Sequence, residues 1–215
     1  MIIKITKDEF VFPTLGKEFK QVVGVSVAAN MREALKEYDA SADEVVVYVD
    51  TPVVLMPENQ LEEENPEQLY KLTVTNEGEE IVVLKNEFSE FNVSVLFSVS
   101  KDLMTVIEDN FQQFEIKHIL TEKFGEAKVS DYKEKTLYAF FYDKTMYAYA
   151  FKQGRLAFFN EFEANEAQNC VFLLLSVYKQ LNYSQLKDQI ILEGDVAFKD
   201  ELKDLLSEFV KNVTV

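Results

Sequence analysis

The sequence contains very few of the residues from which metal sites and many catalytic sites are built. Cys170 is the only cysteine and His118 the only histidine among 215 residues. A single cysteine cannot form an intramolecular disulfide or a cysteine-based metal cluster, and it indicates a reducing compartment. A single histidine leaves a catalytic triad, a histidine-rich zinc site or a metalloprotease helix without its parts. We therefore expect no metal site.

Basic residues and long apolar runs are also scarce. There are 22 Lys and Arg residues against 38 Asp and Glu, which gives a net charge of −16. This charge repels phosphate backbones and anionic lipids, so we expect no nucleic-acid partner. The longest apolar run, 170–175, is far shorter than the ~20 residues that span a bilayer, and the first residues do not resemble a signal peptide. We expect a cytoplasmic protein without direct membrane insertion.

Hydrophobic residues make up 47% of the chain, enough to form a core, and their spacing predicts an α/β fold. In the first half we expect strands at 2–6, 9–15 and 20–27, a helix at 28–38, a strand at 45–49, an acidic loop at 58–68 that leads into a short helix through Tyr70, strands at 80–84 and 92–99, and a helix at 101–114. In the second half we expect strands at 136–142, 145–151 and 155–162, a helix at 165–181, a strand at 189–192 and a final helix near 198–210.

The order of these elements repeats. Three strands, a helix, a strand and a further helix occur in both halves, without matching residue identities. The stretch 117–134 between them is mixed and polar. We therefore predict an N-terminal lobe at 1–116 and a C-terminal lobe at 117–215.

Three segments carry a resemblance to a known group of proteins: 51–58 after a strand, 156–162 at the end of the second meander, and 180–194. The β-β-β-α-β-α pattern, used twice, resembles the actin-like ATPase superfamily, whose two lobes have ribonuclease H-like cores. The sequence is also similar to a bacterial family of uncharacterised proteins with this fold, distantly related to actin-like proteins of type IV pilus assembly. The resemblance implies two ribonuclease H-like lobes in an actin-like arrangement.

It also implies a place for nucleotide. Actin-like ATPases hold phosphates on glycine-containing turns after the first strand of each lobe, with an aspartate that organises magnesium. Here the first such turn, 6–8, has no glycine, and the second, 142–145, keeps Asp143 and Thr145 without flanking glycines. Gly194 ends the late strand. We treat these three residues as a degenerate nucleotide site and expect no cofactor and no enzymatic activity; the alternative is an actin-like ATPase with divergent phosphate loops.

Ten of the 28 aromatic residues lie between Tyr138 and Phe162. Aromatics on a sheet can stack nucleic-acid bases, but such sheets pair them with basic residues, which are few in this segment. We expect cross-strand aromatic packing instead, with one face usable as a protein contact. His118 is expected to have a packing or a surface role near the boundary between the lobes, and Cys170 is expected to be a small buried hydrophobic residue. The helix at 165–181 is apolar nearly all round near Leu173, which indicates burial on several sides or, alternatively, a homodimer contact.

The acidic residues are concentrated in one part of the chain. Residues 51–100 contain ten acidic and two basic residues, a net charge of −8. This concentration of negative charge predicts a surface that binds a basic protein partner, at Glu62, Glu63, Glu64 and Glu67. The alternative is a solvated acidic face without a partner. The sequence thus predicts a catalytically silent actin-like protein that acts as a protein-binding or scaffold module.

Overall fold

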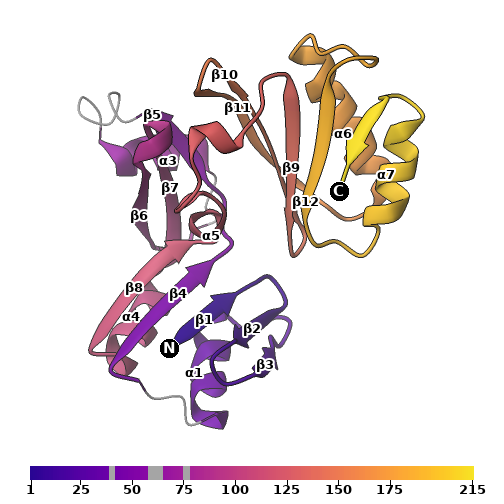
Figure 1. Ribbon diagram of the computed structural model, residues 1–215. Helices are drawn as coiled ribbons and strands as arrows, with labels where there is room; N and C mark the ends of the chain where they lie inside the picture. The colour runs from indigo at the N-terminus through magenta and orange to yellow at the C-terminus, as the bar shows by residue number, and fades with distance from the viewer. Residues whose placement is uncertain (39–41, 58–64, 75–77) are drawn as a thin grey trace. The chain divides into compact units, whose positions relative to one another are not determined.

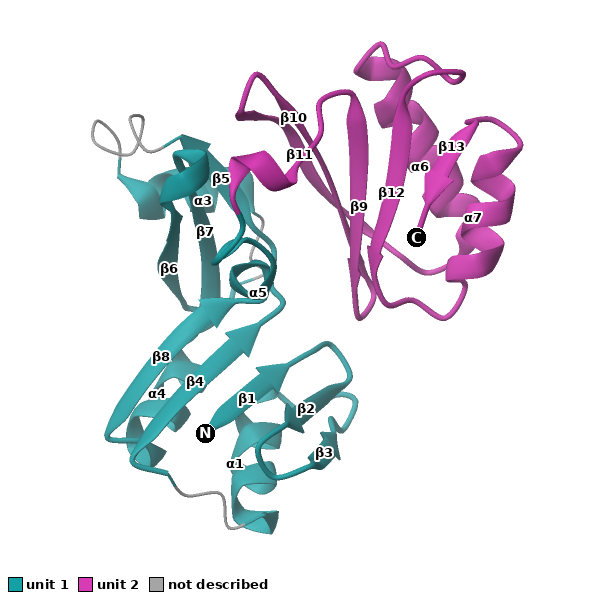
Figure 2. Cartoon of the chain, viewed as in Figure 1, with its two compact units in different colours: residues 1–127 teal, residues 128–215 magenta. Residues whose placement is uncertain are grey.

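The chain forms two compact units, residues 1–127 and 128–215, each with its own mixed sheet (Figure 2). A computed structural model describes residues 1–38, 42–57, 65–74 and 78–215 (Figure 1). The predicted α/β class is confirmed.

The first unit contains β1 (Ile2–Ile5), β2 (Glu9–Phe12), β3 (Lys17–Lys20), α1 (Val27–Glu37), β4 (Glu44–Val49), β5 (Val54–Pro57), α3 (Pro66–Thr73), β6 (Ile81–Phe88), the 3-10 turn η1 (Ser89–Phe91), β7 (Val93–Ser100), α4 (Lys101–Asn110), β8 (Gln113–His118) and α5 (Leu120–Phe124). Its main sheet has the order β3-β2-β1-β4-β8. Helices α1 and α4 contact each other, and their buried residues, such as Met31 and Val106, complete the core with the buried sheet residues Ile3 and Val47.

A second, smaller sheet is inserted between β4 and α4. Its order is β5-β7-β6, and both pairings are antiparallel. Helix α3 is fastened to this insertion by Tyr70, a fully buried residue whose hydroxyl donates to the Pro52 carbonyl at 2.8 Å and accepts from the Ser98 hydroxyl at 3.1 Å. The insertion therefore has a fixed packing of helix on sheet.

The second unit contains the 3-10 turn η2 (Val129–Asp131), β9 (Thr136–Tyr142), β10 (Thr145–Lys152), β11 (Arg155–Glu163), α6 (Ala167–Gln180), β12 (Gln189–Gly194), α7 (Lys199–Ser207) and β13 (Asn212–Thr214). Its sheet has the order β11-β10-β9-β12-β13. The core joins the sheet residues Leu137, Met146 and Ile190 to Leu174 of α6 and Leu202 of α7.

The two main sheets have the same topology. In each, the first strand is central, pairs antiparallel with the second strand and pairs parallel with the strand that follows the first helix. The third strand extends one edge antiparallel, and the last strand extends the other edge parallel. The predicted repeat of pattern is thus present, and the inserted sheet is what distinguishes the first unit from the second.

The units divide at 127/128, whereas the predicted division was at 116/117. Residues 117–127 belong with the first unit for two reasons. Strand β8 extends to His118 and pairs with β4 over its whole length. Helix α5 then packs against β6, and the Phe124 ring lies 5.6 Å from the Phe88 ring.

The expected strand at 20–27 is instead a loop between β3 and α1. Its conformation depends on Asn30, which is only 2% exposed. The Asn30 side chain accepts from the Val22 amide at 2.9 Å and donates to the carbonyls of Val22 and Val25 at 3.3 and 3.2 Å. These bonds replace a strand ladder and leave Val23 almost wholly exposed.

Replacing Asn30 with alanine is expected to lower the free energy of unfolding by about 2 kcal/mol, because three part-buried backbone hydrogen bonds to a buried side chain are lost. Urea denaturation of the two proteins measures this. Asn110→Ala is a suitable control: Asn110 is exposed and donates only to the Val106 carbonyl within its own helix, so a change of about 0.5 kcal/mol or less is expected. Equal losses in the two variants would contradict this account.

Strand β11 lies at the edge of the second sheet and is interrupted by a bulge. Phe158 pairs with Ala150 and Leu156 with Phe151, so Ala157 is an extra residue without a partner in β10. A bulge bends and twists the edge on which it lies. Glu161 and Glu163 add charge to the same strand.

Candidate functional site

In both units the parallel strands bring their carboxyl ends to one edge of the sheet, where open α/β sheets bind ligands. In the first unit these are the ends of β1, β4 and β8, and in the second the ends of β9, β12 and β13. The turns predicted to correspond to phosphate loops lie at these edges.

The β1–β2 turn of the first unit uses its own backbone amides. The Thr6 amide donates to the Glu9 carbonyl at 3.0 Å, and the Thr6 hydroxyl accepts from the amides of Asp8 and Glu9 at 3.4 and 3.1 Å. The Gln21 side chain covers the turn by donating to the Thr6 carbonyl at 2.7 Å. Amides that are bonded within the turn are not available to phosphate oxygens.

A cavity of about 280 Å³ adjoins this turn, between the ends of β1 and β4 and the start of α4. About half of its lining is aliphatic, and the other half is polar or charged: Thr6, Lys7, Gln21, Asp50, Thr51, Glu79, Ser98 and Ser100. Among the described residues, the Thr51 hydroxyl oxygen is buried and has no hydrogen-bond partner. A buried hydroxyl without a partner costs stability, so this cavity is suited to a small polar group.

His118 closes the end of β8 beside Thr51. It is fully buried; its Nε2 donates to the Thr51 carbonyl at 2.9 Å, and its Nδ1 accepts from the Leu120 amide at 3.2 Å. Burial lowers the pKa of the ring to about 4, against a small opposing effect of the Thr51 carbonyl. His118 is therefore neutral near pH 7, and its burial favours the packing role over the surface role.

In the second unit the structure brings the predicted residues Asp143, Thr145 and Gly194 to one edge. Asp143 and Lys144 form the two-residue turn between β9 and β10, and Thr145, which is 8% exposed, begins β10. Gly194 pairs in register with Phe141, close to that turn. The three residues that the sequence analysis treated as a degenerate nucleotide site therefore lie at the same edge of the sheet.

The reason for glycine at position 194 is packing. Its φ is 75°, and a Cβ atom built there would lie 2.0 Å from the Phe141 carbonyl oxygen. The Lys199 side chain, from the start of α7, donates to the Gly194 carbonyl at 2.7 Å. Close approach of β12 to β9 therefore accounts for this glycine without a nucleotide.

One face of the second sheet carries a cluster of aromatic rings. Tyr138 and Tyr149 stack across β9 and β10 at 5.2 Å, and Tyr132 lies 5.2 Å from Tyr138 and 4.4 Å from Phe151. The predicted cross-strand packing is thus present. Tyr138 and Tyr149 are at most 3% exposed, so these rings cannot serve as a platform for bases.

The same cluster contains Glu193, which the sequence analysis did not single out. The Tyr149 hydroxyl donates a short hydrogen bond to the Glu193 carboxylate. Burial first, and the Glu193 charge second, raise the pKa of Tyr149 and of Tyr132 well above the usual range. Both hydroxyls therefore remain protonated donors. The sequence could have indicated this position, because side chains alternate between the two faces of β12 and the alternation places Glu193 on the aromatic face.

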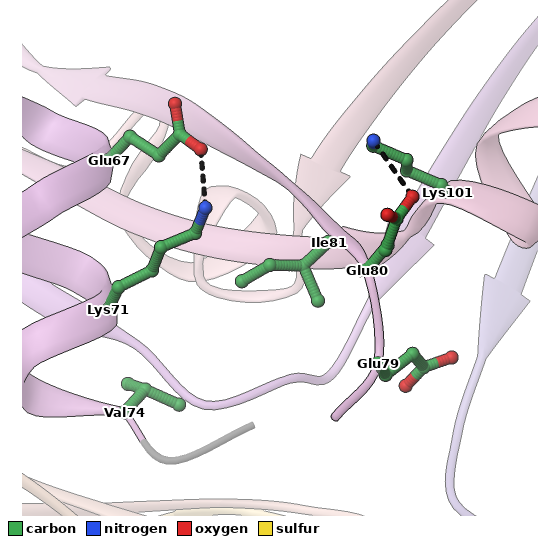
Figure 3. Close-up of a pocket in the computed structure, with 7 residues that line it drawn as sticks. All are labelled: Glu67, Lys71, Val74, Glu79, Glu80, Ile81 and Lys101. Carbon is green, nitrogen blue, oxygen red and sulfur yellow. Dashed lines mark hydrogen bonds and ion pairs between the residues drawn. The ribbon is translucent and has the colours of Figure 1, made fainter. Parts of the chain in front are cut away.

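Of the predicted partner surface, Glu67 lies on α3, whereas Glu62, Glu63 and Glu64 are outside the described residues. Glu67 lines a groove of about 520 Å³ between α3 and the start of β6 (Figure 3). Two ion pairs line the groove. Glu67 and Lys71, both in α3, are 2.6 Å apart, and Glu80 and Lys101 are 2.9 Å apart. The lysines lower the pKa of both carboxyls, so the groove stays charged at neutral pH.

The remaining chemistry-bearing side chains give no further site. Cys170 is fully buried in α6, and burial raises the pKa of its thiol to about 11. Within the described ranges, no group of three or more His, Cys, Asp or Glu side chains is arranged to hold a metal ion. In the same ranges, no helix has the length and apolar character needed to cross a bilayer.

Solved structures define the fold class. A Bacteroides thetaiotaomicron VPI-5482 protein described as having an actin-like ATPase fold and unknown function is 22% identical, with a TM-score of 0.81 over 99% of this chain and 88% of that one. A chain of the PilM–PilN type IV pilus biogenesis complex is 11% identical, with a TM-score of 0.54 over 99% of this chain and 87% of that one. The chain therefore has the actin-like ATPase fold.

The DUF3822 family of proteins of unknown function matches residues 1–213, and the chain belongs to this family. No protein with a curated description matches the sequence. The predicted resemblance to an uncharacterised actin-like family, and distantly to pilus assembly proteins, is confirmed.

Proposed function

We propose that this protein is a catalytically silent member of the actin-like fold that acts as a protein-binding or scaffold module. The observation that carries the proposal is the β1–β2 turn, where Thr6 bonds the amides of Asp8 and Glu9. In the second unit, Gly194 lies where a phosphate-binding glycine would be expected. Its presence is explained by packing, because a side chain at this position would clash with β9.

The nature of the partner follows from charge and from a structural relative. A net charge of −16 disfavours nucleic acid and favours a protein with a basic surface. The PilM chain with the same fold is described in a complex with another protein, PilN. A scaffold role for this chain is consistent with that use of the fold. The buried, single cysteine supports a cytoplasmic location.

The competing function is a nucleotide-binding ATPase with divergent loops. The cavity beside Thr51 favours it, because the buried hydroxyl lacks a partner among the described residues. However, its volume of about 280 Å³ is at the lower limit of ~300–1,000 Å³ that ligand pockets usually have. That space suits a fragment smaller than a nucleoside triphosphate.

Isothermal titration with magnesium ATP separates the two functions. We expect no binding stronger than about 1 mM, because the Asp8 and Glu9 amides of the first turn are bonded to Thr6 and neither turn contains a glycine for the phosphates. Thr6→Gly, which removes the hydroxyl that bonds the turn amides, is a useful companion: a gain of affinity in this variant alone would identify the blocking group. A micromolar Kd for the unaltered protein would overturn the proposed function in favour of the ATPase.

A further inference from the structure

The outer edge of β6, in the inserted sheet, has the features of a strand that accepts another strand. Strand β6 is terminal in the order β5-β7-β6, and among the described residues no strand pairs with its other side. Its first four residues, 81–84, are all apolar and all partly exposed. Its register with β7 has no bulge.

The other edges of the described sheets are protected against such pairing. Strands β3 and β13 are short, β3 begins and ends with lysine, β5 ends in Pro57, β8 carries Glu115 and Lys117, and β11 has its bulge at Ala157. Short length, lysine, proline and bulges are the usual means of blocking an edge. The first half of β6 has none of them.

The pairing with β7 determines which backbone groups of β6 face outward. The Lys101 amide donates to the Glu80 carbonyl at 2.9 Å, so Glu80 is turned toward β7. Because antiparallel ladders alternate, Val82 and Leu84 also bond to β7, and the N–H and C=O groups of Ile81 and Val83 point away from it. Farther along, the edge is occupied, since the Asn86 side chain accepts from the His118 amide at 2.8 Å. Among the described residues, the available edge is therefore 81–84.

The groove beside this edge favours a particular chemistry. Figure 3 shows the Ile81 side chain between the Glu67–Lys71 pair and the Glu80–Lys101 pair, with Glu79 apart from both. The lining carries one more carboxylate than amines, and residues 51–100 as a whole carry −8. A strand bound along the edge meets apolar side chains at Ile81 and Val83 and negative charge at Glu79.

We propose that the outer edge of β6 binds an extended segment of a partner protein, with alternating apolar and basic side chains, by strand addition. Main-chain hydrogen bonds to Ile81 and Val83 provide affinity, and the acidic groove provides selectivity. This inference deepens the proposed protein-binding role and rests on it. A second copy of the chain is a poor occupant, because two copies each carry −16 and antiparallel pairing centred on Val83 places Glu79 opposite Glu87.

A peptide of alternating valine and lysine, as long as β6, tests the proposal by fluorescence anisotropy. It is expected to bind about tenfold or more tightly than a valine–glutamate peptide of equal length. Glu79→Lys should reduce this preference. Equal affinity for the two peptides, or no binding of the valine–lysine peptide, would overturn the inference. The proposed function would stand in that case, since it depends on the nucleotide titration.

Two variants at one position separate strand addition from other modes of contact. Val83→Pro removes an outward N–H without breaking the ladder to β7, so it should weaken binding of the valine–lysine peptide about tenfold. Val83→Ala keeps that N–H and should change affinity by less than about threefold. Equal effects of the two variants would mean that the backbone edge is not the binding element.

Amide hydrogen exchange, measured by NMR on the unaltered chain, tests strand addition at β6 even if the Val83→Pro variant does not fold. Saturating valine–lysine peptide should protect the amides of Ile81 and Val83, whereas those of Val82 and Leu84 are protected with or without peptide. Unchanged exchange at Ile81 and Val83 would overturn the proposal. Sedimentation of the free protein as a dimer that Val83→Pro dissociates would also overturn it, in favour of a second copy at this edge.

Discussion

Replacing Gly194 with alanine is expected to destabilise the second unit by about 3 kcal/mol or more. The new Cβ would lie 2.0 Å from the Phe141 carbonyl oxygen and 3.0 Å from the Phe140 ring, so β12 would have to move away from β9. The φ of 75° adds backbone strain for any residue with a side chain. Urea denaturation followed by tyrosine fluorescence measures the loss, since most of the tyrosines are in this unit.

Gly78→Ala is a matched control. Gly78 also has a φ of 75°, but no atom of the described part of the chain lies within 4 Å of a Cβ atom built there. We expect it to cost about 1 kcal/mol, the effect of backbone conformation alone. If the two variants lose the same stability, close packing of β12 on β9 does not explain Gly194.

The stability of the first unit is expected to fall by about 3 kcal/mol between pH 7 and pH 4 through His118 alone. Its pKa is about 4 in the folded protein and near 6.5 when unfolded. Between these values the unfolded chain binds a proton that the folded chain does not, so protonation favours unfolding as the pH falls. The contribution is fully present above pH 6.5 and is lost on approach to pH 4.

His118→Gln tests this expectation, because an amide can still donate to the Thr51 carbonyl but does not titrate. The variant should be less stable than the wild type at pH 7, and the difference should shrink by about 3 kcal/mol by pH 4. Urea midpoints across this range give the comparison. His118 is the only histidine, and carboxyl titrations are common to both proteins, so they cancel. Parallel pH profiles would contradict the assigned pKa.

The second unit was predicted most closely from sequence. The expected strands at 136–142, 145–151 and 155–162 match β9, β10 and β11 almost residue for residue. Short polar turns separate them, and neighbouring strands in a meander pair with each other, so local pattern and tertiary structure agree. Strand β13 was missed because its three residues gain their strand character only by pairing with β12.

The first unit shows where local pattern is insufficient. The valine-rich stretch 20–27 has the composition of a strand, but Asn30 holds it as a loop through bonds that composition cannot reveal. The expected helix at 101–114 ends at Asn110, and Phe114 instead lies in β8, where it is 37% exposed. Strand β8 depends on a long-range pairing with β4, which sequence periodicity does not report.

The sequence indicated which residues belong to the candidate site, but it did not indicate the hydrogen bonds that these residues and their neighbours make. Asp143, Thr145 and Gly194 could be named from the sequence, and they lie at one edge because strand order determines which turns share an edge. The carboxylate that reaches the aromatic cluster, Glu193, and the amide bonds of Thr6 required side-chain geometry. The absence of glycine from the first turn was visible in the sequence, but the group that occupies its amides was not.

The burial of Cys170 has a consequence for how this protein associates. Thiol–disulfide exchange needs an accessible thiolate, and this thiol is both enclosed in the core and held protonated. Cys170 is also the only sulfhydryl in the chain. The folded chain therefore forms its complexes without an intermolecular disulfide, so their stability responds to ionic strength and not to thiol oxidants.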